Sequence, residues 1–478
     1  MPVTIDVGTT AVKVLQFDVA QQIIKQEKKE YETVYGDGGR AEQDPDVIVE
    51  AVFHCLKKLN LTNKETLILS GAMHSLMAVN QVFHKQTNVM IWADRRADEV
   101  IKTFKQTPQA MLFYKRTKTP IHPMSPFAKL LWLKETSSGQ TLDQSLGDVM
   151  WIDLKTYLWY RLTNFCELDY SLASATGLFN SETLTYDQEI LNFVGITKEQ
   201  LPTLVPVTHT RHVTTAVKQR LGFDHQVMIG SSDGVLANIS EGLHTNDVHV
   251  TIGTSGAIRM TVNKPYTDTD GRLFCYYLND HHWVIGGAVN NGGNVLNWLD
   301  DLLFDGMGHI YSYIDRLDFS SFDPALIFIP HLNGERAPFW DTGRTGSFHG
   351  LKMSHNKAAI VKAVIYGVLF NLRHVFDTLQ HVTGKIEAVY LSGGFFKVPQ
   401  LKTLVSQVLN VSVIESTTLE QTSMGALRLL GEKKRNDKLK YQTITQPPSE
   451  ALKFYYNSYR NCLRMVSSSQ LTNNLSKH

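Results

Sequence analysis

An acidic residue, a glycine and two threonines follow one another closely near the start of the chain, as Asp6, Gly8, Thr9 and Thr10. Apolar and polar residues alternate over Val3–Val7, which predicts a strand that carries the acid. Glycine permits a tight turn, and the threonines place hydroxyls and backbone N–H groups at its tip. Such a turn could hold an anion, and Asp6 could hold the anion's metal ion. An ordinary hairpin with a solvated aspartate is the alternative.

The same signature returns about half a chain later, where Val250–Ile252 leads into Gly253 and Thr254. Two equivalent glycine turns predict a duplicated architecture, with two hairpins that face each other across a cleft. Strand-like and helical segments alternate between them, so the sequence predicts an α/β fold. We expect a first domain over residues 1–244 and a second over residues 245–478, with a polar tail at its end.

A third strand-to-turn transition contains an acid that could act as a base. The apolar run Val227–Ser231 is followed by Asp233 and Gly234, and a helix is expected from Val235. Asp233 therefore stands at the start of a helix, where a plain N-cap is the alternative explanation. Because it lies between the two glycine turns in the sequence, Asp233 is the leading candidate for a general base.

Residues that suit a sugar follow two of the predicted strands. His74 comes just after an apolar strand, and Trp92, Asp94 and Arg95 come after the next. An indole can cover an apolar sugar face, while charged groups bind hydroxyls or a carboxylate. A core histidine, and a helix cap followed by a solvated charged face, are the alternatives.

Two further segments are predicted as ligand-binding loops. Tyr114–Met124 is basic and punctuated by prolines, which would leave Lys115, Arg116 and His122 available to an anion. Asp169–Gly177 is rich in small residues and could approach a ligand closely. A solvated connector and a turn packed under a helix are the respective alternatives.

The second half is rich in glycine at strand ends. Gly286–Gly293 follows a predicted strand and, together with Asn294, could approach a phosphate or ribose. Gly393 and Gly394 end another strand, where an adenine ring could lie on the backbone. No Walker motif occurs, and structural turns are the alternative in both places. The pair Glu335–Arg336 favours a structural role.

The bulk composition excludes several classes of protein. Lysine plus arginine number 47 against 46 acidic residues, a net charge of +1, which gives no support for a nucleic-acid or membrane-surface partner. No apolar run approaches a membrane span, and the N-terminus enters a strand without a secretory signal. Cys55, Cys166, Cys275 and Cys462 show no C-x-x-C spacing, so we expect free thiols in a reducing cytoplasm.

The order and spacing of these motifs resemble the FGGY carbohydrate kinases from Val3 to about Leu430, and within them the gluconate kinases. The resemblance implies two ribonuclease H-like (actin-like ATPase) domains, ATP and Mg²⁺ as cofactors, and a sugar acid as substrate. A homodimer is an option by family analogy alone. The stretches with the closer match are 70–75, 92–94, 114–117, 119–124, 169–177, 251–259 and 282–287.

The resemblance also implies roles for individual residues. Asp6 would hold the Mg²⁺ shell, and Asp233 would be the general base. Cofactor contacts would come from Thr9, Thr10, Gly253, Thr254, Asn294, Gly393 and Gly394. Sugar contacts would come from His74, Trp92, Asp94, Arg95, His122 and Tyr170.

Some features depart from the family pattern or leave the substrate open. Phe395 and Phe396 stand where small residues are usual, Arg96 stands where a smaller polar residue is usual, and the segment between Leu303 and Pro324 is short. The expected reaction is phosphorylation of the terminal hydroxyl of D-gluconate. A kinase for a neutral ketopentose or polyol, and an actin-like ATPase without sugar chemistry, are the alternatives. Candidates for binding a substrate carboxylate are Arg95, Arg96, Arg116 and His122.

Overall fold

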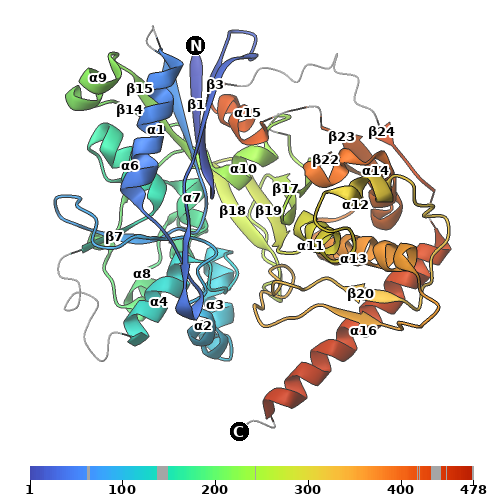
Figure 1. Cartoon of the computed structure of the whole chain (residues 1–478). Helices are drawn as coiled ribbons and strands as arrows, with labels where there is room; N and C mark the ends of the chain where they lie inside the picture. The colour runs from blue at the N-terminus through green and yellow to red at the C-terminus, as the bar shows by residue number, and fades with distance from the viewer. Residues whose placement is uncertain are drawn as a thin grey trace. The chain divides into compact units, whose positions relative to one another are not determined.

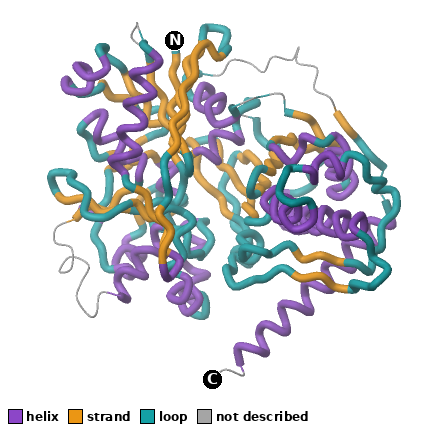
Figure 2. The backbone as a smooth tube through the Cα atoms, in the orientation of Figure 1, coloured by secondary structure: helices purple, strands orange, loops and turns teal. Residues whose placement is uncertain are grey.

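The computed structural model describes residues 1–61, 65–136, 149–242, 244–416, 418, 420–431, 443–447 and 449–475. Helices and strands both occur throughout these residues (Figure 2), in agreement with the predicted α/β class. The chain divides into two compact units. Unit 1 comprises Met1–Thr245, Thr261–Ile285 and Thr418–Asn436, and unit 2 comprises Asn246–Met260, Gly286–Thr417 and Asp437–His478.

Unit 1 is therefore not one continuous stretch of sequence. The division into two domains between residues 244 and 245 stays a prediction. The two compact units are divided differently, because two later segments belong to unit 1. In one of these segments, helix α15 (Gln421–Arg428) packs against helix α10 (Asp233–Asn238). A Cβ atom on Gly425 would lie 1.9 Å from the carbonyl oxygen of Leu236, so only glycine allows this approach.

Unit 1 is organised around a six-stranded sheet (Figure 1). Its strands in spatial order are β14 (Thr210–His212), β15 (Gln226–Ser232), β6 (Thr66–Gly71), β1 (Pro2–Val7), β2 (Ala11–Phe17) and β3 (Ile23–Glu30). β1 pairs antiparallel with β2, which confirms the predicted N-terminal hairpin, and β6 lies parallel to both β1 and β15. Asp6, Ser70 and Ser231 occupy one row across the three parallel strands.

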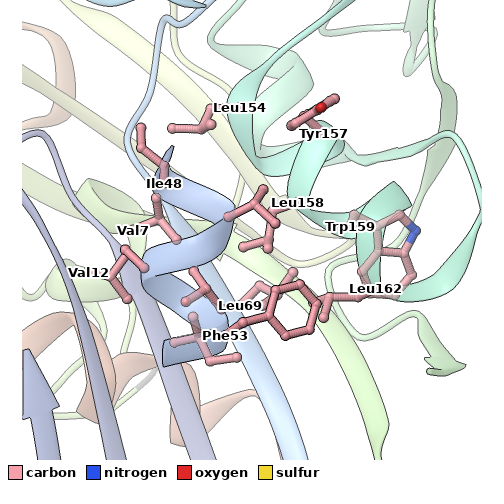
Figure 3. Close-up of a cluster of buried hydrophobic side chains, with 14 of the residues drawn as sticks. Val7, Val12, Ile48, Phe53, Leu69, Leu154, Tyr157, Leu158, Trp159 and Leu162 are labelled. Carbon is pink, nitrogen blue, oxygen red and sulfur yellow. The ribbon is translucent and has the colours of Figure 1, made fainter. Parts of the chain in front are cut away.

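Helices α1 (Pro45–Leu59) and α6 (Leu154–Thr163) pack their apolar side chains against this sheet (Figure 3). The side chain of Asp44 caps α1 by accepting a 2.9 Å hydrogen bond from Asp46 N, and proline is the first helical residue. Val47 lies outside the buried face of the helix, because it is 52% exposed.

The remaining elements of unit 1 surround this sheet and core. They are β4 (Val34–Gly36), β5 (Arg40–Gln43), β7 (Met77–Asn80), β8 (Val89–Met90), α2 (Asp98–Phe104), α3 (Pro108–Thr117), α4 (Pro126–Thr136), β9 (Val149–Ile152), β10 (Glu167–Asp169), α7 (Tyr170–Ser174), β11 (Phe179–Asn180), β12 (Thr185–Tyr186), α8 (Gln188–Val194), β13 (Thr203–Val205), α9 (Thr215–Leu221) and β18 (Phe274–Asn279).

Unit 2 repeats the hairpin-plus-parallel-strand arrangement. β16 (Val248–Ile252) pairs antiparallel with β17 (Gly256–Val262) and parallel with β22 (Ala388–Ser392). This is the pairing that β1 makes with β2 and β6, so the predicted second hairpin is confirmed. Strand β19 (His282–Val289) begins in the Thr261–Ile285 segment of unit 1 and ends in unit 2. The other elements of unit 2 are α11 (Gly293–Leu303), α12 (His309–Ile314), β20 (Ile327–Ile329), β21 (Ser347–His349), α13 (Lys357–Thr383), α14 (Pro399–Leu409), β23 (Ser412–Glu415), β24 (Thr443–Ile444) and α16 (Glu450–Leu475).

Among the described helices, α13 alone has the length and apolarity of a membrane span. Of its most apolar window, 72% is buried inside the protein, which is the environment of a core helix.

Candidate active site

Two carboxylates lie near the carboxyl ends of the parallel strands in unit 1. Ser70 of β6 donates a 3.0 Å hydrogen bond to Oδ1 of Asp6 on β1. Asp233 is the first residue of α10, directly after β15. Burial and then the charge of Asp233 raise the pKa of Asp6 to about 7. The two carboxylates therefore repel each other, and carboxylate oxygens that repel each other in this way suit a divalent cation.

The N-cap of α10 is Ser232 and not Asp233. Ser232 Oγ accepts a 3.4 Å hydrogen bond from Val235 N, while Oδ1 of Asp233 accepts a 2.7 Å bond from the next residue, Gly234. The alternative explanation of Asp233 as a plain N-cap is therefore wrong. Its carboxylate lies in the first turn, where the partial positive charge of a helix start favours the ionised form.

A glycine in β15 sets the course of the strand that leads to Asp233. The pairing of β15 with β6 shifts register between Met228 and Ser231, which marks a bulge. Gly230 in this bulge has a φ of 63°, and a Cβ atom there would lie 1.8 Å from the carbonyl oxygen of Leu69. Only glycine fits, and the bulge redirects the strand end that carries the candidate base.

The first glycine turn is held by residues from other elements. Gln43 Nε2 donates a 2.6 Å hydrogen bond to the carbonyl of Thr9, and Trp92 Nε1 donates a 3.0 Å bond to the Thr9 hydroxyl. Thr10 is exposed at the tip of the turn. The structure thus brings Trp92, which the sequence assigns to the sugar, directly against the predicted phosphate turn.

His74 and Tyr170 each contact a tyrosine of strand β18. Nδ1 of His74 lies 2.9 Å from the carbonyl oxygen of Ala175, so this nitrogen carries the proton and donates it. The His74 ring lies 6.1 Å from the Tyr276 ring, and Tyr170 lies 5.7 Å from Tyr277, both edge-on. The sequence analysis missed both tyrosines, although the aromatic run 274–278 (FCYYL) was the available signal.

Lys129 of α4 is a buried residue that the sequence analysis also missed. Its Nζ donates hydrogen bonds to the carbonyl oxygens of His74 and, at 2.7 Å, Met124. Burial lowers its pKa to about 7, and the neutral amine keeps two N–H groups, which is enough for both carbonyls. His122 Nδ1 accepts a 3.3 Å bond from Met124 N, which leaves the ring proton on Nε2. Lys129 thus ties the segment of His122 to that of His74.

Replacing Lys129 with methionine is expected to change how stability depends on pH. The pKa of Lys129 is about 7 in the folded chain and about 10.4 unfolded, so the unfolded chain holds more protons between these values. The wild type should therefore gain stability relative to Lys129→Met as pH rises from 7 to 10, by up to about 1.4 kcal/mol per pH unit. Urea unfolding at several pH values measures this. The exposed Lys134 on the same helix is the control, and a difference that stays constant with pH would contradict the assignment.

The arginines proposed for a substrate carboxylate are all engaged by acids within unit 1. Arg95 Nη2 lies 2.9 Å from Asp98, and Arg116 Nη1 lies 2.5 Å from Glu189. Arg96 lies 2.6 Å from two acids. Oxygens of Glu42 and of the buried Asp94 accept these bonds, and Asp94 also accepts a bond from Ala41 N.

Two predicted loops contain helices instead. Residues 114–117 are the last turn of α3, so Lys115 and Arg116 are helical and the loop begins only at Lys118. Within Asp169–Gly177, residues 170–174 form α7, and Asp169 caps it by accepting a 2.9 Å bond from Leu172 N. Both predictions gave too much weight to small residues and prolines, which are also compatible with helix starts and ends.

The cap of α7 belongs to a buried ion pair. The ammonium of Lys155 on α6 binds the carboxylate of Asp169, and it donates a 3.0 Å bond to the carbonyl of Ile229. Both charged side chains are almost completely buried. The pair therefore fixes the start of α7, and with it Tyr170, relative to β15 and the bulge before Asp233.

In unit 2 the second glycine turn contacts the glycine-rich segment before α11. The carbonyl of Gly253 accepts a 2.8 Å bond from Gly293 N, and that of Thr254 accepts a 3.0 Å bond from Asn294 N. The Asn294 amide bonds the backbone of Gly292 at 2.8 Å and of Asn290 at 3.1 Å. The structure thus brings Gly253, Thr254 and Asn294 together.

The third glycine segment lies against the same strand end. Gly393 has a φ of 103°, and a Cβ atom there would lie 2.2 Å from the carbonyl oxygen of Ile252, so glycine is required. Gly394 opens a short 3₁₀ helix. Phe395 and Phe396 are buried, so their rings belong to the core of unit 2.

Glu335 is a buried hub that supports the glycine-rich segment. Its carboxylate accepts bonds of 2.6 Å from Asn290 N, 2.9 Å from the Asn291 amide and 2.7 Å from the Asn371 amide. Arg336 bonds the side chain of Asn290 at 2.7 Å. These contacts agree with the structural role favoured for this pair.

Known proteins resemble the chain over nearly its whole length. The FGGY family of carbohydrate kinases matches with its N-terminal domain over residues 1–240 and with its C-terminal domain over residues 248–431. A gluconokinase of Bacillus subtilis strain 168 is 36% identical over 444 residues, which cover 88% of this chain and 85% of that protein.

Two solved structures from Lactobacillus acidophilus have the same fold. A ligand-bound xylulose kinase is 32% identical, with a TM-score of 0.90, and the match covers 98% of this chain and 99% of that one. A gluconate kinase is 31% identical, with a TM-score of 0.88, and the match covers 98% and 97%.

Proposed function

Since this chain belongs to the FGGY family of carbohydrate kinases, and so is an ATP-dependent sugar kinase with two actin-like ATPase domains, we propose that its substrate is D-gluconate. The reaction moves the γ-phosphoryl group of ATP to the terminal hydroxyl and gives 6-phosphogluconate. The similarity to the gluconokinase of Bacillus subtilis over 88% of the chain carries this proposal. Membership of the family removes the alternative of an ATPase without sugar chemistry.

Asp233 is the general base in this proposal. It accepts the proton of the terminal hydroxyl as that oxygen attacks the γ-phosphorus, so that no free alkoxide has to form first. Two features support the role: the carboxylate lies in the first turn of α10, and the bulge at Gly230 fixes the strand before it. Asp6 fits a Mg²⁺ site, because burial and then the charge of Asp233 raise its pKa to about 7, and Mg²⁺ would neutralise phosphate charge there.

Backbone N–H groups and hydroxyls of the glycine turns bind the phosphates. Thr9 and Thr10 serve this role in unit 1, and Gly253 and Thr254 serve it in unit 2. Gly393 and Gly394 accept the adenosine, and Asn294, whose N–H bonds the Thr254 carbonyl, is a further cofactor contact. Because Phe395 and Phe396 are buried, their bulk does not argue against this assignment.

The carboxylate of gluconate is bound by His122 and not by the arginines. Arg95, Arg96 and Arg116 each pair with an acid of unit 1. His122 has its ring proton on Nε2, and Lys129 ties its segment to that of His74. We therefore assign the carboxylate to His122 and the sugar hydroxyls to His74, with the rings of Trp92 and Tyr170 along the sugar.

The His122→Asn variant tests this assignment. A hydrogen bond to a charged group is worth about 1.5–3 kcal/mol, so KM for gluconate should rise roughly 10–100-fold with kcat little changed. KM for MgATP, which has no contact with His122 in this proposal, should stay within about twofold. An equal rise of both KM values would mean that His122 only shapes the site.

Coupled ADP release with MgATP tests the substrate itself, with gluconate, xylulose, glycerol, ribulose and no sugar as the panel. Turnover with gluconate alone supports the proposal. The xylulose kinase of Lactobacillus acidophilus, with its TM-score of 0.90, makes a ketopentose the second candidate. Turnover with xylulose and none with gluconate would replace one substrate by the other and leave the kinase chemistry intact.

The enzyme is proposed to act in the cytoplasm. Its four cysteines are free thiols, and three of them are buried. Burial raises the pKa of Cys166 and of Cys275 to about 12, so neither is a reactive thiolate at neutral pH. Free, unreactive thiols are typical of a reducing compartment.

A further inference from the structure

We propose that unit 1 carries a second anion site, which binds a small molecule with a phosphate group, in a hollow formed by β3, α1 and α9. The hollow has a volume of about 250 Å³. Lys29 of β3, His54 and Lys57 of α1, and Arg220 of α9 line it, together with Glu50 and Phe53. None of these residues belongs to the glycine turns or to the sugar residues described above.

Three of the basic side chains have no ion-pair or hydrogen-bond partner in the described part of the chain. Within the described part of the chain, Lys29, His54 and Lys57 form no ion pair and donate no side-chain hydrogen bond. Their sequence neighbours differ in this respect. Lys28 lies 2.7 Å from Glu30, and Lys58 lies 3.8 Å from Glu27. Lys28 and Lys58 thus have acidic partners, whereas Lys29 and Lys57, which line the hollow, do not.

The one acid in the hollow is already neutralised. Both oxygens of Glu50 accept hydrogen bonds from the Arg220 guanidinium, at 3.0 and 2.5 Å, and the guanidinium lies 3.9 Å from the centre of the Phe53 ring. The Glu50 carboxylate and the Arg220 guanidinium therefore add no net charge to the hollow. The net charge that remains is that of the two lysines, which matches a phosphate monoester or inorganic phosphate.

The surroundings favour a small anion over a nucleic acid. Glu27 and Glu30 lie on β3 with Lys29, and Asp224 follows α9, so acids alternate with the basic residues on these elements. A backbone of repeated phosphates needs a continuous basic path, whereas one phosphate group does not.

Calorimetric titration of the full chain with inorganic phosphate tests the site. A saturating non-hydrolysable ATP analogue should be present, so that the glycine turns are occupied. The Lys29→Gln/Lys57→Gln variant is expected to weaken phosphate binding about tenfold or more, since both charge-assisted contacts are lost. The Lys28→Gln/Lys58→Gln variant changes the net charge equally on the same two elements, and it should bind within about twofold of the wild type.

A second arm identifies the source of the phosphate. Tighter binding of 6-phosphogluconate than of inorganic phosphate, at a site that the Lys29→Gln/Lys57→Gln variant loses, would support a sugar phosphate as ligand, and equal binding at that site would support free phosphate. The site itself does not depend on the substrate of the kinase. Absence of saturable phosphate binding, or an equal loss in both double variants, would overturn the proposal.

Discussion

Replacing Asp233 with asparagine is expected to lower kcat by about 10²–10⁴-fold, the usual contribution of a general base. The amide has the same shape and can still accept the hydrogen bond that Gly234 N donates to Oδ1 at 2.7 Å, so α10 should start normally. It cannot take a proton from the sugar hydroxyl. ATP binding should therefore persist while turnover is lost, which steady-state kinetics and calorimetry with ATP would show side by side.

The exposed Asp224 provides the matched control for this experiment. It pairs with Lys218 at 3.1 Å, and Asp224→Asn removes one negative charge from the same unit. We expect kcat of this variant to stay within about twofold of the wild type, since distant exposed charges are screened. Turnover near the wild-type rate in Asp233→Asn would remove this residue from the base role.

Breaking the buried pair of Lys155 and Asp169 is expected to have the largest effect on stability. Lys155→Met leaves the Asp169 carboxylate buried without its cation, which typically costs about 3–5 kcal/mol. Asp169→Asn leaves the ammonium unpaired but keeps an acceptor for Leu172 N, so the cap of α7 survives. Denaturant unfolding, followed by circular dichroism, measures both changes.

The double variant distinguishes the interaction between Lys155 and Asp169 from the separate effect of each side chain. With both charges removed, Lys155→Met/Asp169→Asn should recover most of the loss, so the two single effects should be far from additive. Lys218→Met, which breaks the exposed pair with Asp224, should cost less than about 1 kcal/mol. Equal costs for the exposed and buried lysines would show that burial does not govern this interaction.

The strands and turns were predictable because their signals are local. Alternation over Val3–Val7 and a glycine turn are enough to define the N-terminal hairpin, and Asp44 followed by proline defines the start of α1. The same logic placed Asp233 at a helix start. The sequence could not show which residue is the N-cap of α10, because Ser232 and Asp233 are both good N-cap residues and only the backbone geometry distinguishes them.

The supporting charges were not predictable, because burial of a lysine depends on contacts distant in sequence. Lys129 and Lys155 lie in apolar helices, where a lysine ordinarily projects to solvent. One binds the carbonyl of His74 and the other an acid that caps the next helix. Arg96 is the opposite case. The sequence made it a candidate for binding a substrate carboxylate, but in the structure it is paired with Asp94 and Glu42.

The late segment of unit 1 governs when that unit can be completed during synthesis. Helix α15 (Gln421–Arg428) belongs to this late segment and covers α10 at the contact between Gly425 and Leu236. At about 5–20 residues per second, the ribosome needs on the order of ten to thirty seconds to pass from residue 245 to residue 418. Throughout that interval the helix of Asp233 lacks its cover, and Lys13 lacks Glu420, its ion-pair partner at 2.6 Å. The nascent chain therefore holds the candidate base in an unfinished environment until almost all of the protein has been made.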